Sequence, residues 1–347
     1  MRRALVVSGG GSKGAFAVGV IRQLKRNFPA LEFDFFVGTS TGALLLPLAA
    51  MDQYTLLEEL YTAQETEDVL LKSNIGNRLN EHSIFDATPL WLLIGRYYND
   101  TRYNELVNSG KKIYLNTVCL QTGELVVFTN DEDAIDGTYY KVKRIFDADH
   151  FRRAIMASAC QPVFMPPIRV NLNVPGEPHP NYQFVDGGVR EYVGIQMAID
   201  AGAKEIIVII LSPENDPPEE IEYKNLFHLL ERSIDVLSGD IGKNDLLLPA
   251  QFNEALTYIA AVKTKMLADG ISADVIHDYF STPGIDNPFV GKMPLKIYTI
   301  RPETPLGGGP GGLTFDPNEM KEMLAKGRQV LNQYVATLDP DDTSGWV

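Results

Sequence analysis

Cysteine is scarce in this chain, and long apolar runs are missing. The only cysteines among the 347 residues are Cys119 and Cys160, which excludes a disulfide-stabilised scaffold and fits a reducing compartment. No stretch has the roughly 20 apolar residues of a membrane span, and residues 1–20 do not follow the pattern of a secretory signal. We therefore expect a cytoplasmic protein without a transmembrane segment. Export without a cleaved signal and peripheral membrane association stay open.

Positive charge is also in short supply. The chain has 31 Lys and Arg residues against 45 Asp and Glu residues, which gives a net charge of −14. This balance argues against a nucleic-acid partner, which needs a basic surface, and against purely electrostatic attraction to anionic membranes. Any lipid contact would have to be apolar or local. No loop has the ligand spacing of a calcium site, so we expect neither a metal nor a cofactor.

A sharp turn stands between an apolar run and a run of helix formers. Residues 33–37 are typical of a strand, and residues 43–50 are typical of a helix. Between them lies G-x-S-x-G, the pattern of a nucleophile elbow, in which a strand-to-helix turn exposes a serine hydroxyl. We predict Ser40 as the nucleophile. The rest of the elbow is Gly38, Thr39, Thr41 and Gly42, whose glycines avoid a Cβ clash in so tight a turn.

A glycine-rich turn precedes the elbow by some thirty residues. It follows the β-prone residues 4–7 and leads into apolar residues at helical spacing. The turn consists of Gly9, Gly10, Gly11, Ser12, Lys13 and Gly14. Bare N–H groups at the start of a helix attract negative charge, so this turn could form an oxyanion hole or bind a phosphate.

An aspartate, Asp186, ends a short apolar run and precedes Gly187 and Gly188. Alone, such an aspartate–glycine pair usually marks a β-turn. Beside a serine nucleophile it has a second interpretation, because that serine needs a proton acceptor within hydrogen-bond reach. Asp186 is the candidate for this acceptor.

Taken in this order, the glycine-rich turn, the elbow and the Asp-Gly-Gly motif resemble the patatin-like phospholipases. Residues 156–167 are similar to the family's A-S-x-A-x-P-x-x-F-P-P block, and the resemblance covers residues 4–212. It implies that the glycine-rich turn forms an oxyanion hole, that Ser40 attacks an ester and that Asp186 completes a Ser–Asp dyad.

The chain departs from the family pattern at three places. Lys13 stands where arginine is usual, and Ser8 stands where many members have aspartate. Residues 190–195 replace the N-x-P segment that often follows the Asp-Gly-Gly motif, so the loop behind Asp186 is expected to have a different shape.

Apolar runs and helical patterns alternate from the start of the chain. Strands are expected at residues 4–8 and 33–38, with helices at 13–27 and 41–51. This order predicts an α/β layered fold with a mainly parallel central sheet flanked by helices. Residues 111–130 are expected to form two further strands.

The division of the chain is predicted at about residue 212. We expect a patatin-like catalytic core over 1–212. It should be followed by a C-terminal helical region over 213–347 that includes a late strand at 295–300. The two parts should pack as one domain. Residues 221–240 and 244–268 are expected to form two helices that serve as core or as a lid. The composition of residues 307–312 indicates a mobile loop.

We expect a lipid acyl hydrolase of the phospholipase A or lysophospholipase type, acting on a lipid or membrane-surface ester. A Ser-Asp-His esterase of the α/β-hydrolase type would need His228 or His277 as its base. A dinucleotide-binding protein would use the first turn as G-x-G-x-x-G, with Glu32 or Asp34 on a ribose. An inactive lipid-binding relative and an acyl transferase also stay open. The sequence does not reveal head group, chain length or oligomeric state.

Overall fold

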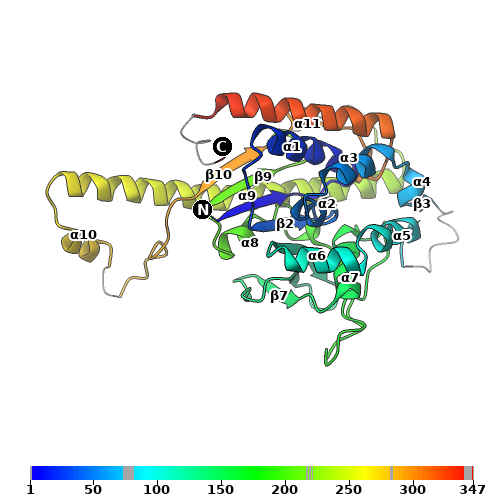
Figure 1. The fold of residues 1–347 in the computed structure, drawn as a ribbon, viewed down its shortest axis with the longest axis horizontal. Helices are drawn as coiled ribbons and strands as arrows, with labels where there is room; N and C mark the ends of the chain where they lie inside the picture. The colour runs from blue at the N-terminus through cyan, green and yellow to red at the C-terminus, as the bar shows by residue number, and fades with distance from the viewer. Residues whose placement is uncertain are drawn as a thin grey trace.

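A single mixed sheet forms the centre of the molecule. The structure, a computed structural model, describes residues 2–72, 82–215, 218, 220, 222–281, 284–339 and 346. The strands follow the order β10-β9-β1-β2-β5-β6-β7, and β8 pairs with β5. Figure 1 labels β10, β9, β2 and β7 of this sheet. Their bounds are β1 Arg3–Val7, β2 Phe35–Thr39, β5 Lys112–Cys119, β6 Leu125–Thr129, β7 Tyr140–Arg144, β8 Phe184–Asp186, β9 Glu205–Ile209 and β10 Lys296–Ile300.

The expected parallel arrangement is confirmed for most of this sheet. Strands β10, β9, β1, β2 and β5 run parallel to one another, whereas β6 and β8 run antiparallel to β5. The two strands expected within residues 111–130 are β5 and β6. Because parallel strands bring their carboxyl ends to one edge, ligands of such sheets usually bind there.

Helices cover both faces of the sheet. Along β1, Leu5 and Val7 face one apolar cluster, and Ala4 and Val6 face another, as the alternation of side chains in a strand requires. The first cluster contains residues of α1 (Gly14–Asn27), α2 (Thr41–Ala50), α3 (Tyr54–Ala63), α5 (Thr88–Tyr97), α6 (Asp100–Asn108), α7 (Ala148–Ala159) and α11 (Pro317–Thr337). The second contains α8 (Ile195–Asp200). Burial on both faces is typical of parallel sheets.

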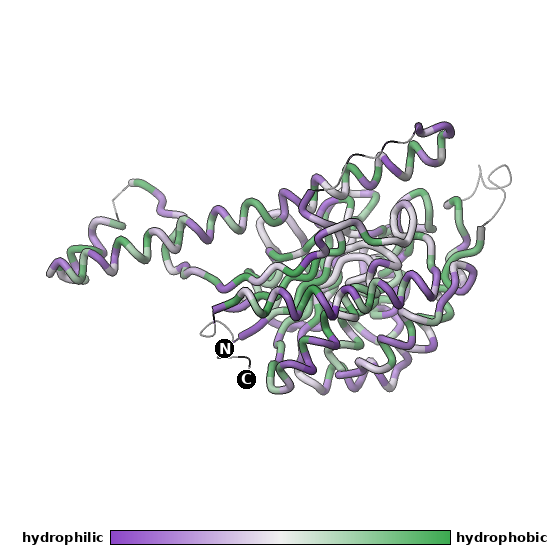
Figure 2. Tube along the Cα trace, turned by 90° about the horizontal axis from the view of Figure 1, so that it is seen from above, coloured by the Kyte–Doolittle hydropathy of each residue, from purple (hydrophilic) through white to green (hydrophobic). Residues whose placement is uncertain are grey.

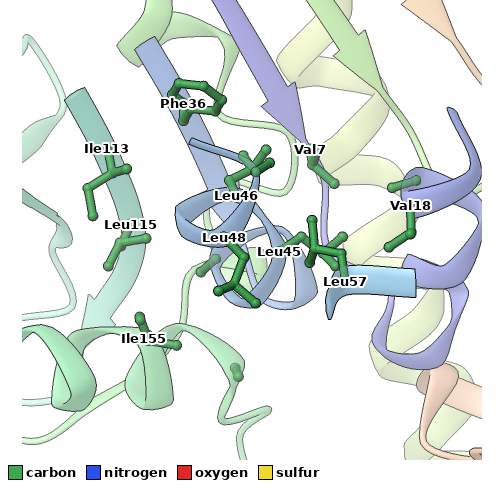
Figure 3. Packing of buried hydrophobic residues seen from close by; sticks show 14 of the residues in the cluster. Val7, Val18, Phe36, Leu45, Leu46, Leu48, Leu57, Ile113, Leu115 and Ile155 are labelled. Atoms are coloured by element: carbon green, nitrogen blue, oxygen red, sulfur yellow. The ribbon is translucent and has the colours of Figure 1, made fainter. Parts of the chain in front are cut away.

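Helix α2, which starts directly after Ser40, is apolar on all sides. All its residues except Leu44 are buried, which is the pattern of a helix inside a core. In Figure 3 its leucines lie between β-strand residues such as Phe36 and Val7 and the helix residue Ile155. The nucleophile elbow is therefore anchored to a buried helix of the hydrophobic core.

The C-terminal helix α11 lies against the first helix, α1 (Figure 1). Two glycines allow this close approach. A Cβ on Gly19 would lie 2.1 Å from the carbonyl oxygen of Leu324, and one on Gly327 would lie 2.1 Å from that of Phe16. The two ends of the chain thus pack backbone to backbone on one face of the sheet.

The prediction of two helices at 221–240 and 244–268 was wrong, because one helix, α9, runs from Leu226 to Ala268. The glycines of this stretch lower helix propensity, but tertiary contacts of the first half outweigh that cost. The second half and α10 (Ala273–Tyr279) extend from the body as an arm (Figure 2). Within the described ranges, no helix combines the length and apolarity that crossing a bilayer requires.

Candidate active site

The register of the sheet brings the two predicted dyad residues together. Thr39, the last residue of β2, pairs with Asn116 of β5, and Asp186, the last residue of β8, pairs with the next β5 residue, Thr117. Strand β6 occupies the other edge of β5, so β8 and β2 lie end to end along the same edge. Adjacent strand positions are about 3.3 Å apart. Ser40, which follows Thr39, therefore meets Asp186.

The elbow around Ser40 has strained backbone geometry. Its φ of 56° and ψ of −120° lie outside the regions that side-chain-bearing residues normally adopt. A Cβ on Gly38 would lie 2.4 Å from the carbonyl carbon of Gly42, and one on Gly42 would lie 2.2 Å from the carbonyl oxygen of Val7. Both motif glycines are therefore required, because neighbouring backbone atoms leave no room for a Cβ. The strand before the turn and the helix after it are present as predicted.

Ser158, at the end of α7, holds the backbone of the elbow. Its hydroxyl accepts a hydrogen bond from the Ser40 N–H at 3.1 Å and donates one to the carbonyl of Asn116 at 2.7 Å. Ser158 lies within residues 156–167, to which the sequence analysis gave no individual roles. The signal in the sequence was one hydroxyl among small apolar residues, and the structure shows that Ser158 is fully buried.

The side chain of Asp186 is buried beside Ser40. Its carboxylate accepts a hydrogen bond from the N–H of Gly188 at 2.8 Å. Burial raises the pKa of Asp186 to about 6, although the Ser40 hydroxyl and the Gly188 N–H act in the opposite direction. The carboxylate is ionised at neutral pH and is a stronger base than an ordinary aspartate, which suits proton transfer.

The glycine-rich turn lies beside the serine at the start of α1. Gly10 and Gly11 have positive φ values of 150° and 57°, which suit glycine. In the described part of the chain, their N–H groups donate to no protein acceptor. Together with Lys13, both residues line a cavity that Ser40 also lines. Gly9 and Ser12 are packed behind them and are absent from its wall.

A second glycine segment, residues 307–312, packs on the first. A Cβ on Gly11 would lie 2.2 Å from the carbonyl oxygen of Gly312. The segment is tied down by Asp235, which accepts from the Gly311 N–H at 3.3 Å, and by Glu319, which accepts from the Gly308 N–H at 3.0 Å. Composition indicated a mobile loop, whereas the structure uses these glycines for close backbone contact.

Ser40 and Asp186 open into a cavity of about 750 Å³. An apolar recess of about 70 Å³ adjoins it between α2, α3 and α5. Leu44, Val69 and Leu90 line both spaces, so these three side chains lie between the recess and the cavity. The structure thus provides a mostly apolar compartment next to an adjoining serine and carboxylate.

The residues that a Ser-Asp-His esterase or a dinucleotide-binding protein would require do not lie where those functions need them. His228 lines the cavity at the exposed start of α9, but the side chain that acts on the Asp186 carboxylate is Ser40, and His277 lies on α10 in the arm. Glu32 pairs with surface lysines, and Asp34 accepts from the N–H of Arg3 at the beginning of β1. Both acids therefore lie at the opposite end of β1 from the glycine-rich turn.

Comparison with known proteins fits this arrangement. The sequence model of the family described as "Patatin-like phospholipase" matches residues 5–199, which is more than half of the chain. The protein therefore belongs to the patatin-like phospholipase family. This membership supports lipid hydrolysis as the general activity of the family.

Two individual proteins show a weaker similarity to this chain. An Escherichia coli K12 protein described as "Uncharacterized protein YjjU" is 26% identical over 216 residues, which are 61% of this chain and 52% of that protein. The match thus spans about half the length of this curated relative. The crystal structure of VipD from Legionella pneumophila aligns with a TM-score of 0.47 and 11% identity over 97% of this chain and 67% of that one.

Proposed function

We propose that this protein hydrolyses carboxylic esters of lipids through a Ser40–Asp186 dyad, as a phospholipase A or lysophospholipase. The observation that carries the proposal is that the Ser40 hydroxyl and the buried Asp186 carboxylate lie next to each other in the wall of the cavity, beside the N–H groups of the glycine-rich turn. Family membership supports the lipid substrate class.

The proposed reaction has two halves. The Ser40 oxygen attacks the ester carbonyl carbon while its proton moves to Asp186, and the N–H groups of Gly10 and Gly11 stabilise the oxyanion. When the tetrahedral intermediate collapses, the C–O bond to the alcohol breaks and Asp186 returns the proton to that alcohol. Water then attacks the acyl-enzyme and gives a proton to Asp186; when the bond between the acyl carbon and the Ser40 oxygen breaks, Asp186 returns that proton to Ser40 and the fatty acid leaves.

The decisive variant is Ser40→Ala, because it removes the attacking oxygen alone. We expect it to lower ester turnover by at least about 10³-fold with an unchanged melting temperature. Turnover should be measured on phospholipids, lysophospholipids, galactolipids and p-nitrophenyl esters, with Ser233→Ala as a control because that serine is exposed on α9. A folded Ser40→Ala protein with wild-type turnover on the same substrates would exclude the proposal.

The apolar recess is proposed to hold the acyl chain. Leu90 lines both the recess and the cavity, so Leu90→Trp would place a bulky ring between them and block the way from Ser40 into the recess. Each buried methylene contributes about 0.8 kcal/mol, so we expect kcat/KM for a decanoyl p-nitrophenyl ester to fall about tenfold or more. The value for the butyryl ester should stay within about twofold.

The matched control for this variant is Leu92→Trp, on the same helix but 66% exposed. It should leave the chain-length profile unchanged. An equal loss for both esters in Leu90→Trp, or no loss for either, would place the acyl chain elsewhere.

A further inference from the structure

The loop that follows the Asp-Gly-Gly motif is held by a carboxylate from a helix far away in the sequence. Asp245, in the first half of α9, accepts hydrogen bonds from the N–H of Tyr192 at 2.7 Å and from that of Val193 at 3.0 Å, both with Oδ2. This loop is the segment that departs from the family pattern, which has N-x-P at this place. The chain therefore fixes the loop by a contact across the fold.

The fastened loop carries Tyr192 against the glycine-rich turn. A Cβ on Gly9 would lie 2.9 Å from Tyr192 Cε2, and one on Gly188 would lie 3.2 Å from Cδ2. The Tyr192 carbonyl also accepts the Gly9 N–H at 3.3 Å. One residue thus contacts both the turn beside Ser40 and the loop of Asp186, and it lines the cavity with them.

The opposite side of the tyrosine ring faces α9. A Cβ on Gly242, one turn before Asp245, would lie 3.0 Å from Tyr192 Cδ1. The ring therefore has no spare room between α9 and the turn. A shift of α9 or of the loop would be passed directly to Gly9 and its neighbours, because packed interiors transmit displacement.

The loop is also tied to the end of β2. The Thr39 hydroxyl donates to the carbonyl of Glu191 at 3.3 Å, and the Glu191 carboxylate accepts the Gly194 N–H at 2.9 Å. Burial and the neighbouring Asp245 raise the pKa of Glu191. These contacts fix the two ends of the loop, and Asp245 fixes its middle.

We propose that Asp245 is a positioning residue for ester hydrolysis, holding Tyr192 against the glycine-rich turn so that the turn's N–H groups face the carbonyl at Ser40. The inference rests on the proposed function and deepens it. It makes the first half of α9 a fixed wall of the active site. Asp245 acts through Tyr192 and does not itself line the cavity.

The test compares two substitutions of Asp245 with a control on the same helix. Asp245→Ala leaves two N–H groups without their acceptor, and we expect kcat on a p-nitrophenyl ester to fall on the order of 10- to 100-fold, with KM within about threefold. Asp245→Asn keeps an oxygen that can accept both bonds, so its kcat should recover to within about threefold of the wild type. Asp240→Ala, exposed on α9, should leave both constants unchanged.

A further variant separates positioning from stability. Gly242→Ala places a methyl group against the Tyr192 ring and also favours the helix, so kcat should fall while the melting temperature stays the same or rises. Wild-type kcat in folded Asp245→Ala, or in Gly242→Ala, would overturn the inference. An Asp245→Asn protein as slow as Asp245→Ala would also overturn it. Absence of ester turnover in the wild-type protein would instead refute the proposed function itself.

Discussion

Replacing Asp186 by asparagine is expected to abolish ester turnover and, at pH 8, to make the protein more stable. Asparagine can still hydrogen-bond to Ser40 and Gly188 but cannot take the serine proton, so we expect a loss of at least about 10³-fold. In the wild type, burial raises the pKa of Asp186 to about 6, which means that ionisation of this carboxyl opposes folding. Removing the ionised group should add about 1–3 kcal/mol to the free energy of unfolding at pH 8.

The sign of this effect fixes its pH dependence. Between about pH 4 and pH 6 the unfolded protein releases the Asp186 proton while the folded protein retains it, so the wild type loses stability as pH rises through this window. The advantage of Asp186→Asn should therefore be full above pH 6 and vanish near pH 4. Urea denaturation of both proteins across this range measures the difference. Equal stability at pH 8 would show that the carboxylate is not destabilised by its site.

The same titration should appear in the activity of the wild type. Because the proposed base must be ionised, kcat/KM should rise with pH through about 6 and then level off. A profile that is flat across this range would contradict the assignment of Asp186 as the proton acceptor.

Replacing Gly11 by alanine is expected to lower kcat about 10²- to 10³-fold. The new Cβ would lie 2.2 Å from the carbonyl oxygen of Gly312, and the φ of 57° disfavours any side chain. The turn must shift, and its N–H groups leave the position of the oxyanion; losing one such donor has effects of this size. Steady-state kinetics on a p-nitrophenyl ester measures the loss.

Gly95→Ala is the matched control for this variant. Gly95 is exposed on α5, and nothing lies within 4 Å of an added Cβ. Its activity should stay within about twofold of the wild type, and its stability should rise because alanine favours helices. A Gly11→Ala protein with the activity of this control would show that the turn does not contribute to catalysis.

Local sequence signals predicted the part of the site that depends on neighbouring residues. The elbow around Ser40 needs only a strand, two glycines and a helix in succession, and all of them are visible in one short window. The glycine-rich turn is equally local. The mainly parallel sheet followed from the alternation of strands and helices.

Contacts between segments that are far apart in the sequence could not be predicted from such local signals. The meeting of Ser40 with Asp186 depends on the positions along β5 at which β2 and β8 both end, which no local pattern contains. The hydrogen bonds of Ser158 and Asp245 are of the same kind, since both side chains act on backbone groups from other elements. Glycines 307–312 were misinterpreted because close backbone packing and flexibility have the same composition.

The most direct measurement is labelling of the wild-type protein with a fluorophosphonate, followed by peptide mapping of the adduct. Such probes react with an activated serine, so the account predicts one phosphonyl group per chain on Ser40, at a rate that falls sharply in Asp186→Asn. An adduct on a different residue would contradict it, as would Ser40 labelling at the same rate in wild type and Asp186→Asn.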